Sequence, residues 1–356
     1  MSALFSPFTI RSVTLRNRVV VSPMCQYSSD DGFANDWHFV HLGAFAVGGS
    51  GLVLTEATAV TPEGRISPQD LGIWDDAHID GLRRINDFLH AHGAASGVQL
   101  AHAGRKASTK RPWEGGGTVD VSDGGWINVL APSDIAFADN YPQPQALSEA
   151  GIVRIIDAFR DAAVRAAAAR FQVIELHGAH GYLLHQFLSP LSNLRTDRYG
   201  GSFENRTRLM REVVAAVRTV WPESAPLIVR LSATDWADGG WNPDECVQLA
   251  TLLASDGVDL IDTSSGGLVA NAKIPIAPGY QVPFARRLRH EAKIATGAVG
   301  LITDAQQAED IVAGGDADVV LFARELLRNP RWPLAAAHRL GAAIIWPPQY
   351  ERAKPR

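Results

Sequence analysis

Two histidines and a tyrosine stand close together in the stretch IELHGAHGYLLHQFLSP, residues 174–190. His177 and His180 are three residues apart, and Tyr182 follows two residues later. A metal site, a pair of internally satisfied core histidines and a substrate clamp would each use such residues. In a clamp, two neutral imidazoles donate N–H bonds to one oxygen while the phenol transfers a proton. That pairing would polarise a carbonyl or nitro group and stabilise its developing negative charge.

A metal site at this place would need a third ligand. Glu175, His102 and Cys25 are the candidates that the sequence offers. On a strand, however, Glu175 shares the face of His177 but lies one layer deeper. A metal-dependent lyase or aldolase that uses His177 and His180 is therefore the alternative function.

The elements that must position this cluster are eight short segments rich in β-branched residues, and a helical pattern follows each of them. Their near-continuous apolar character is typical of parallel strands that are covered on both faces. Eight alternations predict a (β/α)₈ TIM barrel, and no G-x-G-x-x-G follows the first strand to suggest a Rossmann fold. The segments are 18–24, 51–60, 96–104, 171–178, 226–233, 258–266, 293–300 and 317–324.

Apolar stripes at helical spacing predict two of the intervening helices. The stripes are Leu209, Val213, Val217 and Val220 in one helix, and Ile152, Ile156, Phe159 and Ala163 in the other.

Length and composition are those of one decorated barrel, so residues 1–356 are predicted to form a single domain. Hydrophobic residues make up 46% and charged residues 20%, and the net charge of −5 includes no basic run. Nucleic acid is therefore not expected as a partner. No secretory signal or membrane-length apolar run is apparent, and two cysteines are too few for a disulfide framework. The sequence predicts a soluble, cytoplasmic protein.

In such barrels the active site lies at the carboxyl ends of the strands. Polar or glycine residues stand at nearly every predicted exit, which fits a large ligand across the barrel mouth. Gly297, Gly300 and Arg324 follow the last two strands, where these barrels commonly bind phosphate. Glycine lets backbone N–H groups approach an anion, and a helix beginning at Arg324 would add a favourable dipole.

Residues 105–148, between the third and fourth strands, are rich in Gly, Pro, Asp and Trp. A structureless loop of that length is unusual inside a compact domain. The segment is therefore a lid over the site, a small subdomain or a tolerated surface insertion.

Taken together, these stretches resemble the Old Yellow Enzyme family of FMN-dependent ene-reductases, in particular its thermophilic-like branch. The resemblance covers almost the whole chain, and the combination of HGAHGYLLHQFLSP (177–190) with YGGSFENR (199–206) is its most specific part. Further matches are VVSPMCQYS (20–28), VQLAHAGRKA (98–107), RELLRNP (324–330) and QYER (349–352).

The resemblance implies FMN over the barrel mouth and NADPH (or NADH) as the hydride donor. The implied cofactor-binding residues are Pro23, Met24, Cys25, Ala57, Gln99, Arg230, Val299, Gly300, Ala323 and Arg324. His177 and His180 would hold the substrate oxygen and Tyr182 would protonate the α-carbon. Cys25, Tyr27, Lys106 and Arg352 would line the substrate site.

The implied reaction is a ping-pong reduction of the activated C=C bond of an α,β-unsaturated carbonyl or nitro compound. In this branch a C-terminal arginine enters the active site of a neighbouring subunit. Residues 341–356, with Arg352, are therefore expected to reach another subunit of a homodimer or homotetramer. Ala323 stands where many relatives have glycine, which adds a methyl group near the expected phosphate.

Overall fold

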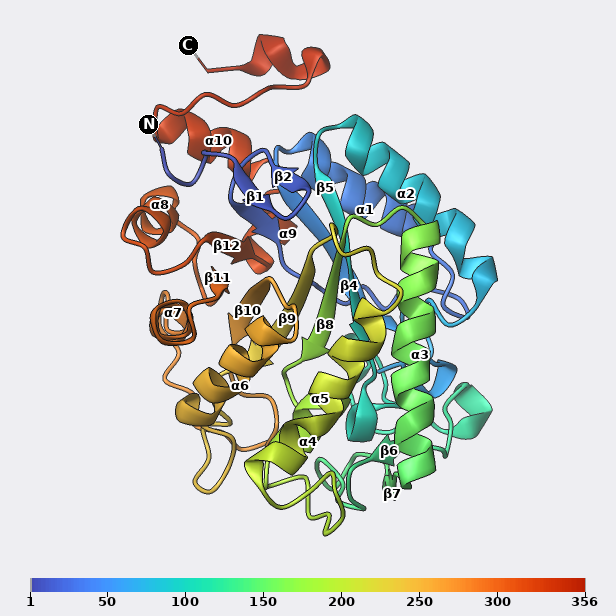
Figure 1. Cartoon of the computed structure of the whole chain (residues 1–356). Coiled ribbons are helices and arrows are strands. Elements are labelled where there is room, and N and C mark those ends of the chain that lie inside the picture. Colours follow the sequence, from blue (N-terminus) through green and yellow to red (C-terminus); the bar gives the residue numbers. More distant parts are fainter. Residues whose placement is uncertain (1, 356) are drawn as a thin grey trace.

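Eight parallel strands close into a barrel in the computed structural model of the chain, which describes residues 2–355 (Figure 1). Around the barrel the order is β10-β11-β12-β3-β4-β5-β8-β9. All eight predicted strand segments are confirmed. The strands are β3 (Val19–Val21), β4 (Leu52–Ala59), β5 (Ala95–Ala101), β8 (Val173–Gly178), β9 (Leu227–Ser232), β10 (Leu260–Ser264), β11 (Ala295–Ala298) and β12 (Val319–Phe322).

Helices follow the strands and cover the outside of the barrel (Figure 1). Their apolar faces pack on the outward side chains of the sheet, which explains why the strands are buried on both faces. The helices are α1 (Asp36–Val47), α2 (Ile79–Ala91), α3 (Glu149–Ala168), α4 (Leu183–Leu188), α5 (Phe203–Arg218), α6 (Pro243–Ser255), α7 (Val282–Arg287), α8 (Ala305–Ala313), α9 (Arg324–Arg328) and α10 (Trp332–Arg339). Single turns are η1 (Pro62–Gly64) and η2 (Asp76–His78), and the π-turn η6 (Leu288–Ala292) follows α7.

An N-terminal hairpin that the sequence analysis did not predict closes the far end of the barrel. It consists of β1 (Phe8–Ile10) and β2 (Val13–Leu15), which pair antiparallel. Ile10, Val13 and Leu15 pack against inward-facing residues near the strand starts, such as Leu52 and Leu260. Because this plug fills one end with apolar side chains, only the carboxyl ends of the strands present polar groups to a ligand.

Two details of the predicted helices were wrong. Val220 lies beyond α5, which ends at Arg218, and its side chain is only half-buried. In α3 the buried position is Ile155, whereas Ile156 is half-buried. Both side chains nevertheless pack against the buried core, so the predicted stripes lie on the core side of their helices.

The 105–148 segment is not structureless. It holds the single-turn helices η3 (Gly104–Lys106), η4 (Pro112–Glu114) and η5 (Val121–Asp123), and the short strands β6 (Leu130–Ala131) and β7 (Gln145–Ala146), which pair parallel.

The C-terminal tail lies at the end of the molecule where the barrel strands begin, opposite the end to which the arrowheads of β8 and β9 point (Figure 1). It ends in the single-turn helix η7 (Pro348–Ala353), whose residues are all at least partly exposed. Within residues 2–355, no helix combines the length and the apolar character needed to cross a membrane.

Candidate active site

A layer of polar side chains crosses the barrel interior just below its mouth. Gln99 of β5 donates to Glu175 of β8 with an Nε2–Oε1 distance of 2.7 Å. Arg230 of β9 pairs with Asp262 of β10 at 2.9 Å. Burial and the Asp262 carboxylate raise the pKa of Glu175 to about 8, so this acid is largely protonated at neutral pH. The layer therefore presents the amide of Gln99 and the guanidinium of Arg230 without excess negative charge beneath them.

His177, His180 and Tyr182 gather above this layer at the carboxyl end of β8. The His177 ring centroid lies 5.2 Å from that of His180 and 4.9 Å from that of Tyr182, both pairs edge to face. His180 adopts a left-handed backbone (φ +57°) in the turn between β8 and α4, and Tyr182 occupies the position just before α4 begins. The Nε2 atom of His180 lies 2.7 Å from the Ser264 hydroxyl on β10.

Burial sets the protonation of the three rings. Loss of hydration, assisted by the positive charge of Arg230, holds the pKa of both His177 and His180 well below its usual range. Burial raises the Tyr182 pKa well above that of a free phenol. At neutral pH the site therefore offers two neutral imidazoles and a protonated phenol. The Nδ1 atom of His177 is buried without a hydrogen-bond partner among the described residues, which is the situation that a ligand oxygen would relieve.

Cys25 and Tyr27 lie beside this cluster, after β3. Together with Tyr182 and Trp126 they pack around an apolar group formed by Ile66, Ala103, Ala107 and Val129. Burial, with the Asp70 and Glu56 carboxylates, raises the pKa of the Cys25 thiol well above its usual range. Cys25 is therefore a neutral thiol at the site and not a thiolate nucleophile.

Pro23 and Met24 are half-buried on the stretch between β3 and Cys25. Ala57 is buried on β4 and lines a small cavity with Tyr182. A register shift in β4 between Leu54 and Ala57 places Ala57 opposite Gln99. The predicted residues of the first three barrel strands thus converge on the same side of the mouth.

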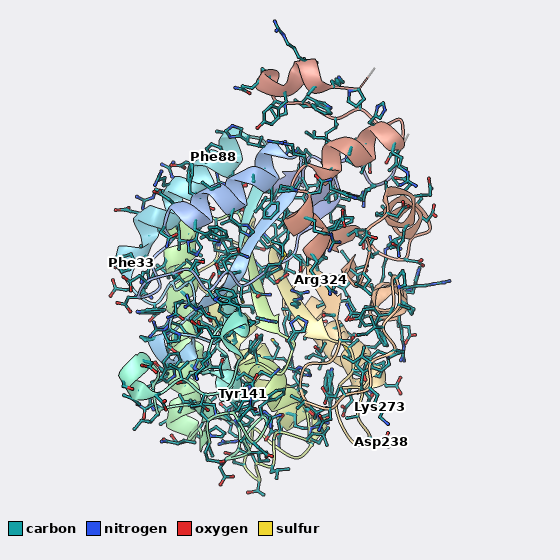
Figure 2. The ribbon with its side chains drawn as sticks, turned by 180° about the vertical axis from the view of Figure 1, so that it is seen from behind. Phe33, Phe88, Tyr141, Asp238, Lys273 and Arg324 are labelled. Atoms are coloured by element: carbon teal, nitrogen blue, oxygen red, sulfur yellow. The ribbon has the colours of Figure 1, made fainter. Side chains whose placement is uncertain are left out.

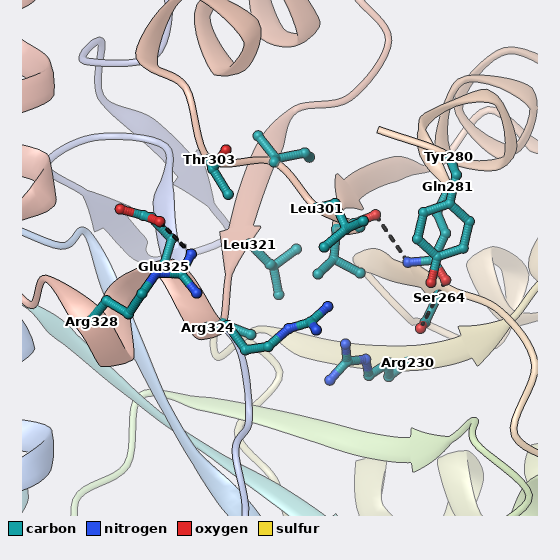
Figure 3. A pocket seen from close by; sticks show the side chains of 14 residues that line it. Arg230, Ser264, Tyr280, Gln281, Leu301, Thr303, Leu321, Arg324, Glu325 and Arg328 are labelled. Atoms are coloured by element: carbon teal, nitrogen blue, oxygen red, sulfur yellow. Dashed lines mark hydrogen bonds and ion pairs between the residues drawn. The ribbon is translucent and has the colours of Figure 1, made fainter. Parts of the chain in front are cut away.

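A second cavity of about 250 Å³ opens between β11, β12 and α9 (Figure 3). The guanidinium groups of Arg230 and Arg324 point into it, and Arg324 lies near the middle of the molecule in Figure 2. Arg328 pairs with Glu325 at 2.6 Å, whereas no carboxylate pairs with Arg324 within residues 2–355. The predicted residues Arg230, Val299, Gly300, Ala323 and Arg324 all line this cavity, with Ser264, Tyr280, Gln281, Leu301, Ile302, Thr303, Leu321, Glu325 and Arg328.

The backbone around this cavity suits an anion. Gly300 has φ +127°, and a Cβ atom there would lie 3.0 Å from Gln281 Nε2 and 3.2 Å from the Tyr280 ring. The side-chain amide of Gln281 donates to the Val299 carbonyl and fixes this turn (3.0 Å, dashed in Figure 3). Ala323 has φ −112°, outside the left-handed region that favours glycine.

Sequence reasoning missed Tyr280 and Gln281 as lining residues. They come from the segment that begins α7, about 20 residues after the strand that they face, and no motif marks them. Ser264 stands at a predicted strand exit, but only the 2.7 Å contact with His180 indicates its part in the site.

Two predicted substrate residues are placed differently from the rest. Lys106 lies at the site, but its Nζ atom donates to the backbone oxygens of His180 (2.8 Å) and Gly267. Burial lowers the Lys106 pKa to about 7. Arg352 is exposed in η7, and the fold does not bring the tail to the mouth of its own barrel (Figure 1).

The metal alternative finds no support in this geometry. Within residues 2–355, no three His, Cys, Asp or Glu side chains are grouped so as to hold a metal ion. Glu175, the third ligand considered above, accepts from Gln99 in the deeper layer.

Comparison with known proteins agrees with this arrangement. A family model described as "NADH:flavin oxidoreductase / NADH oxidase family" matches residues 3–342. The chain is 51% identical over 352 residues to an NADPH dehydrogenase of Halalkalibacterium halodurans, covering 98% of each chain. It is 52% identical over 351 residues to an NADPH dehydrogenase of a Geobacillus species, again over 98% of each. Among solved structures, morphinone reductase superposes with a TM-score of 0.79 at 28% identity, covering 96% of this chain and 91% of that one.

Proposed function

Since the chain belongs to the NADH:flavin oxidoreductase / NADH oxidase family, the family of the Old Yellow Enzymes, we propose that it reduces activated C=C bonds. The chain is an FMN-dependent oxidoreductase that uses NAD(P)H. The proposed acceptors are small electrophilic alkenes, namely α,β-unsaturated carbonyl and nitro compounds. The observation that carries the proposal is the cluster of buried His177 with half-buried His180 and Tyr182, which offers two neutral imidazoles and one phenol.

The residues at the mouth fit FMN. The cavity at Gly300 and Arg324 suits its phosphate, because it combines a close backbone approach with the Arg324 guanidinium, which pairs with no carboxylate of residues 2–355. Gln99 and Arg230 would face the pyrimidine edge, and Pro23, Met24 and Ala57 the ring. FMN bound there would supply the hydride chemistry that links NAD(P)H to the β-carbon of the alkene.

Substrate binding rests on the two imidazoles. His177 and His180 would each donate one N–H bond to the carbonyl or nitro oxygen, and both donors gain strength as negative charge builds there. Tyr182 would give its proton to the α-carbon and regain one from solvent. The hydride from NAD(P)H and the proton from Tyr182 together add H₂ across the C=C bond. Both electrons come from NAD(P)H, and the enzyme is regenerated. The two substrates use one mouth in turn, which gives ping-pong kinetics.

The test is direct. Purified protein, reconstituted with FMN if necessary, is expected to show flavin absorbance and, under anaerobic conditions, to oxidise more than one equivalent of NADPH only when 2-cyclohexenone is present. The product should be cyclohexanone. A flavin-loaded protein that oxidises NADPH with oxygen but leaves 2-cyclohexenone and nitroalkenes unreduced would contradict the acceptor class.

Replacing Arg324 with Ala is expected to weaken FMN binding by about tenfold to a hundredfold, the value of one charge-assisted hydrogen bond. The dissociation constant is measured by quenching of FMN fluorescence as the apoprotein binds it. Arg286→Ala removes an exposed arginine that pairs with Asp316 and serves as the control. An unchanged constant in Arg324→Ala would mean that the phosphate lies elsewhere.

We also propose that the chain works as a homodimer or homotetramer whose tail, residues 341–356, enters a neighbouring site. Ala342 and Ile344 at the start of the tail pack against the core, and Tyr350 accepts a hydrogen bond from Arg331 at 3.0 Å. Ile345 is 84% exposed and is therefore available to a neighbouring subunit. Arg352 is exposed as well, and would be the group that meets the neighbour's substrate.

Truncation after Pro348 is expected to raise the KM for 2-cyclohexenone roughly tenfold, the effect of one lost charge-assisted bond, without bleaching the flavin. Arg352→Ala should reproduce that change, while Lys354→Ala should not. Sedimentation velocity reports the assembly in parallel. A KM that stays the same in the truncated protein would rule out a shared site.

A further inference from the structure

The Lys106 ammonium lies where three separate segments meet. It donates to the His180 carbonyl on the turn after β8, at 2.8 Å, and to the Gly267 carbonyl on the loop after β10. Its remaining side faces the Phe137 ring of the 105–148 segment, 4.1 Å from the centroid. The Tyr182 ring centroid is 5.6 Å away. The ammonium is thus committed to protein groups and not presented to the mouth.

The two turns that Lys106 joins are packed without spare room. His180 and Gly181 have φ values of +57° and +71°, and Gly266 and Gly267 have +71° and +88°. A Cβ atom on Gly181 would lie 2.3 Å from the Gly267 oxygen, and one on Gly267 would lie 2.6 Å from the His180 Cα atom. A non-glycine residue in this conformation carries strain that its surroundings must offset.

The Lys106 side chain supplies that compensation. The carbonyl oxygens of His180 and Gly267 approach one Nζ atom, so two partly buried acceptors share one donor group. Without it, both carbonyls would lose this donor at a place where water replaces it only in part, which disfavours this arrangement of the turns. An amine also has two N–H groups, so both protonation states of Lys106 can serve both carbonyls.

The neighbouring Arg105 strengthens the same junction. Its Nη2 atom donates to the Leu268 carbonyl at 2.8 Å, and its backbone N–H donates to Gln186 of α4 at 3.2 Å. Its Nη1 atom reaches the Ile135 carbonyl at 3.4 Å, in the 105–148 segment. The segment between β5 and α3 is therefore attached at its start to the turns after β8 and β10, and it returns to the same place near Phe137.

We propose that Lys106 is a positioning residue that acts through His180. By holding the His180 carbonyl it fixes the left-handed turn that aims the His180 ring at Ser264 and the substrate oxygen, and through Phe137 it couples the 105–148 segment to that ring. The inference rests on the proposed function and replaces the substrate contact expected for Lys106 from the sequence.

A double-mutant cycle on the FMN-loaded enzyme tests this. Lys106→Met, close in size but without a donor, is expected to lower kcat/KM for 2-cyclohexenone by about tenfold to a hundredfold, as misplacement of a catalytic group does. In the His180→Ala background the same substitution should have almost no further effect, because the ring that it positions is gone. Lys106→Arg should restore part of the loss. Lys110→Met, at an exposed position four residues on, is the control and should behave as wild type.

Hydrogen exchange gives a readout that does not depend on the acceptor. In the FMN-loaded Lys106→Met protein, peptides covering 178–186 and 264–270 should exchange faster than in the wild type, with other barrel peptides unchanged. The proposal would be overturned if the decreases in kcat/KM of Lys106→Met and His180→Ala multiplied in the double mutant. It would also be overturned if hydrogen exchange in those peptides stayed unchanged. If the wild type fails to reduce enones yet exchange still rises in the variant, then the proposed function fails and the positioning role stands.

Discussion

Replacing Tyr182 with Phe is expected to slow turnover of 2-cyclohexenone by about a hundredfold to ten-thousandfold, the range in which a positioned general acid contributes. The phenol is the only group that the cluster of His177, His180 and Tyr182 offers as an acid, because both imidazoles are held neutral. The substitution keeps the ring that packs with Cys25 and Tyr27, so the pocket shape is retained. Stopped-flow absorbance measures the two half-reactions separately.

The two half-reactions distinguish the roles that Tyr182 can have. Bleaching of the flavin absorbance by NADPH requires no proton from Tyr182 and should proceed within a few-fold of the wild-type rate. The return of the flavin absorbance on mixing with enone should show the whole decrease in rate. Tyr199→Phe removes a hydroxyl that bonds Glu212 away from the mouth, and serves as the matched control. Equal slowing of both half-reactions would mean that Tyr182 shapes the pocket and is not the acid.

The barrel was predictable because its strands are buried on both faces. Segments such as 171–178 and 226–233 are rich in apolar residues, interrupted by the few polar side chains that face the barrel interior, and this pattern depends on the strand and its immediate neighbours only. The β1–β2 hairpin was missed because each of its strands has three residues, too few for a pattern. Its burial depends on the open end of a barrel that forms from the rest of the chain.

The same division between local and distant information holds for the site. His177, His180 and Tyr182 are neighbours in sequence, so one turn after one strand brings them together. Ser264 and Gln281 reach the site from other strands and loops; Ser264 is marked only by its place at a predicted strand exit, and nothing marks Gln281. Lys106 was expected at the site from the family resemblance alone. Its backbone contacts depend on two left-handed turns about 75 and 160 residues away, which the sequence does not reveal.

The charge beneath the mouth bears on how strongly the imidazoles act. Arg230 shares its charge with Asp262, and Glu175 is largely protonated at neutral pH. The cluster above this layer is therefore close to neutral overall, with its polar N–H groups in a buried setting. In such surroundings a hydrogen bond to a developing oxyanion is worth more than in water.

Replacing His177 with Ala is consequently expected to lower kcat for 2-cyclohexenone by about a hundredfold to a thousandfold, as loss of one oxyanion donor does. The Nδ1 atom of His177 has no protein partner among the described residues. Removing the ring therefore takes a hydrogen bond from the substrate oxygen but from no protein group. His177→Asn keeps an N–H donor near the same place and should retain most of the activity. The loss should fall on kcat more than on KM, because the bond strengthens as charge develops.

The structural contribution of His177 can be separated from its part in the reaction. Flavin content and thermal unfolding of His177→Ala should match those of His290→Ala, which removes an exposed imidazole on η6. Comparing a series of acceptors adds a second discriminant. Nitroalkenes delocalise negative charge over two oxygens, so one lost donor matters less, and their turnover should fall by a smaller factor than that of 2-cyclohexenone. If both acceptors lost the same factor, with KM rising and kcat unchanged, His177 would bind substrate and transition state alike, and the oxyanion role would fall.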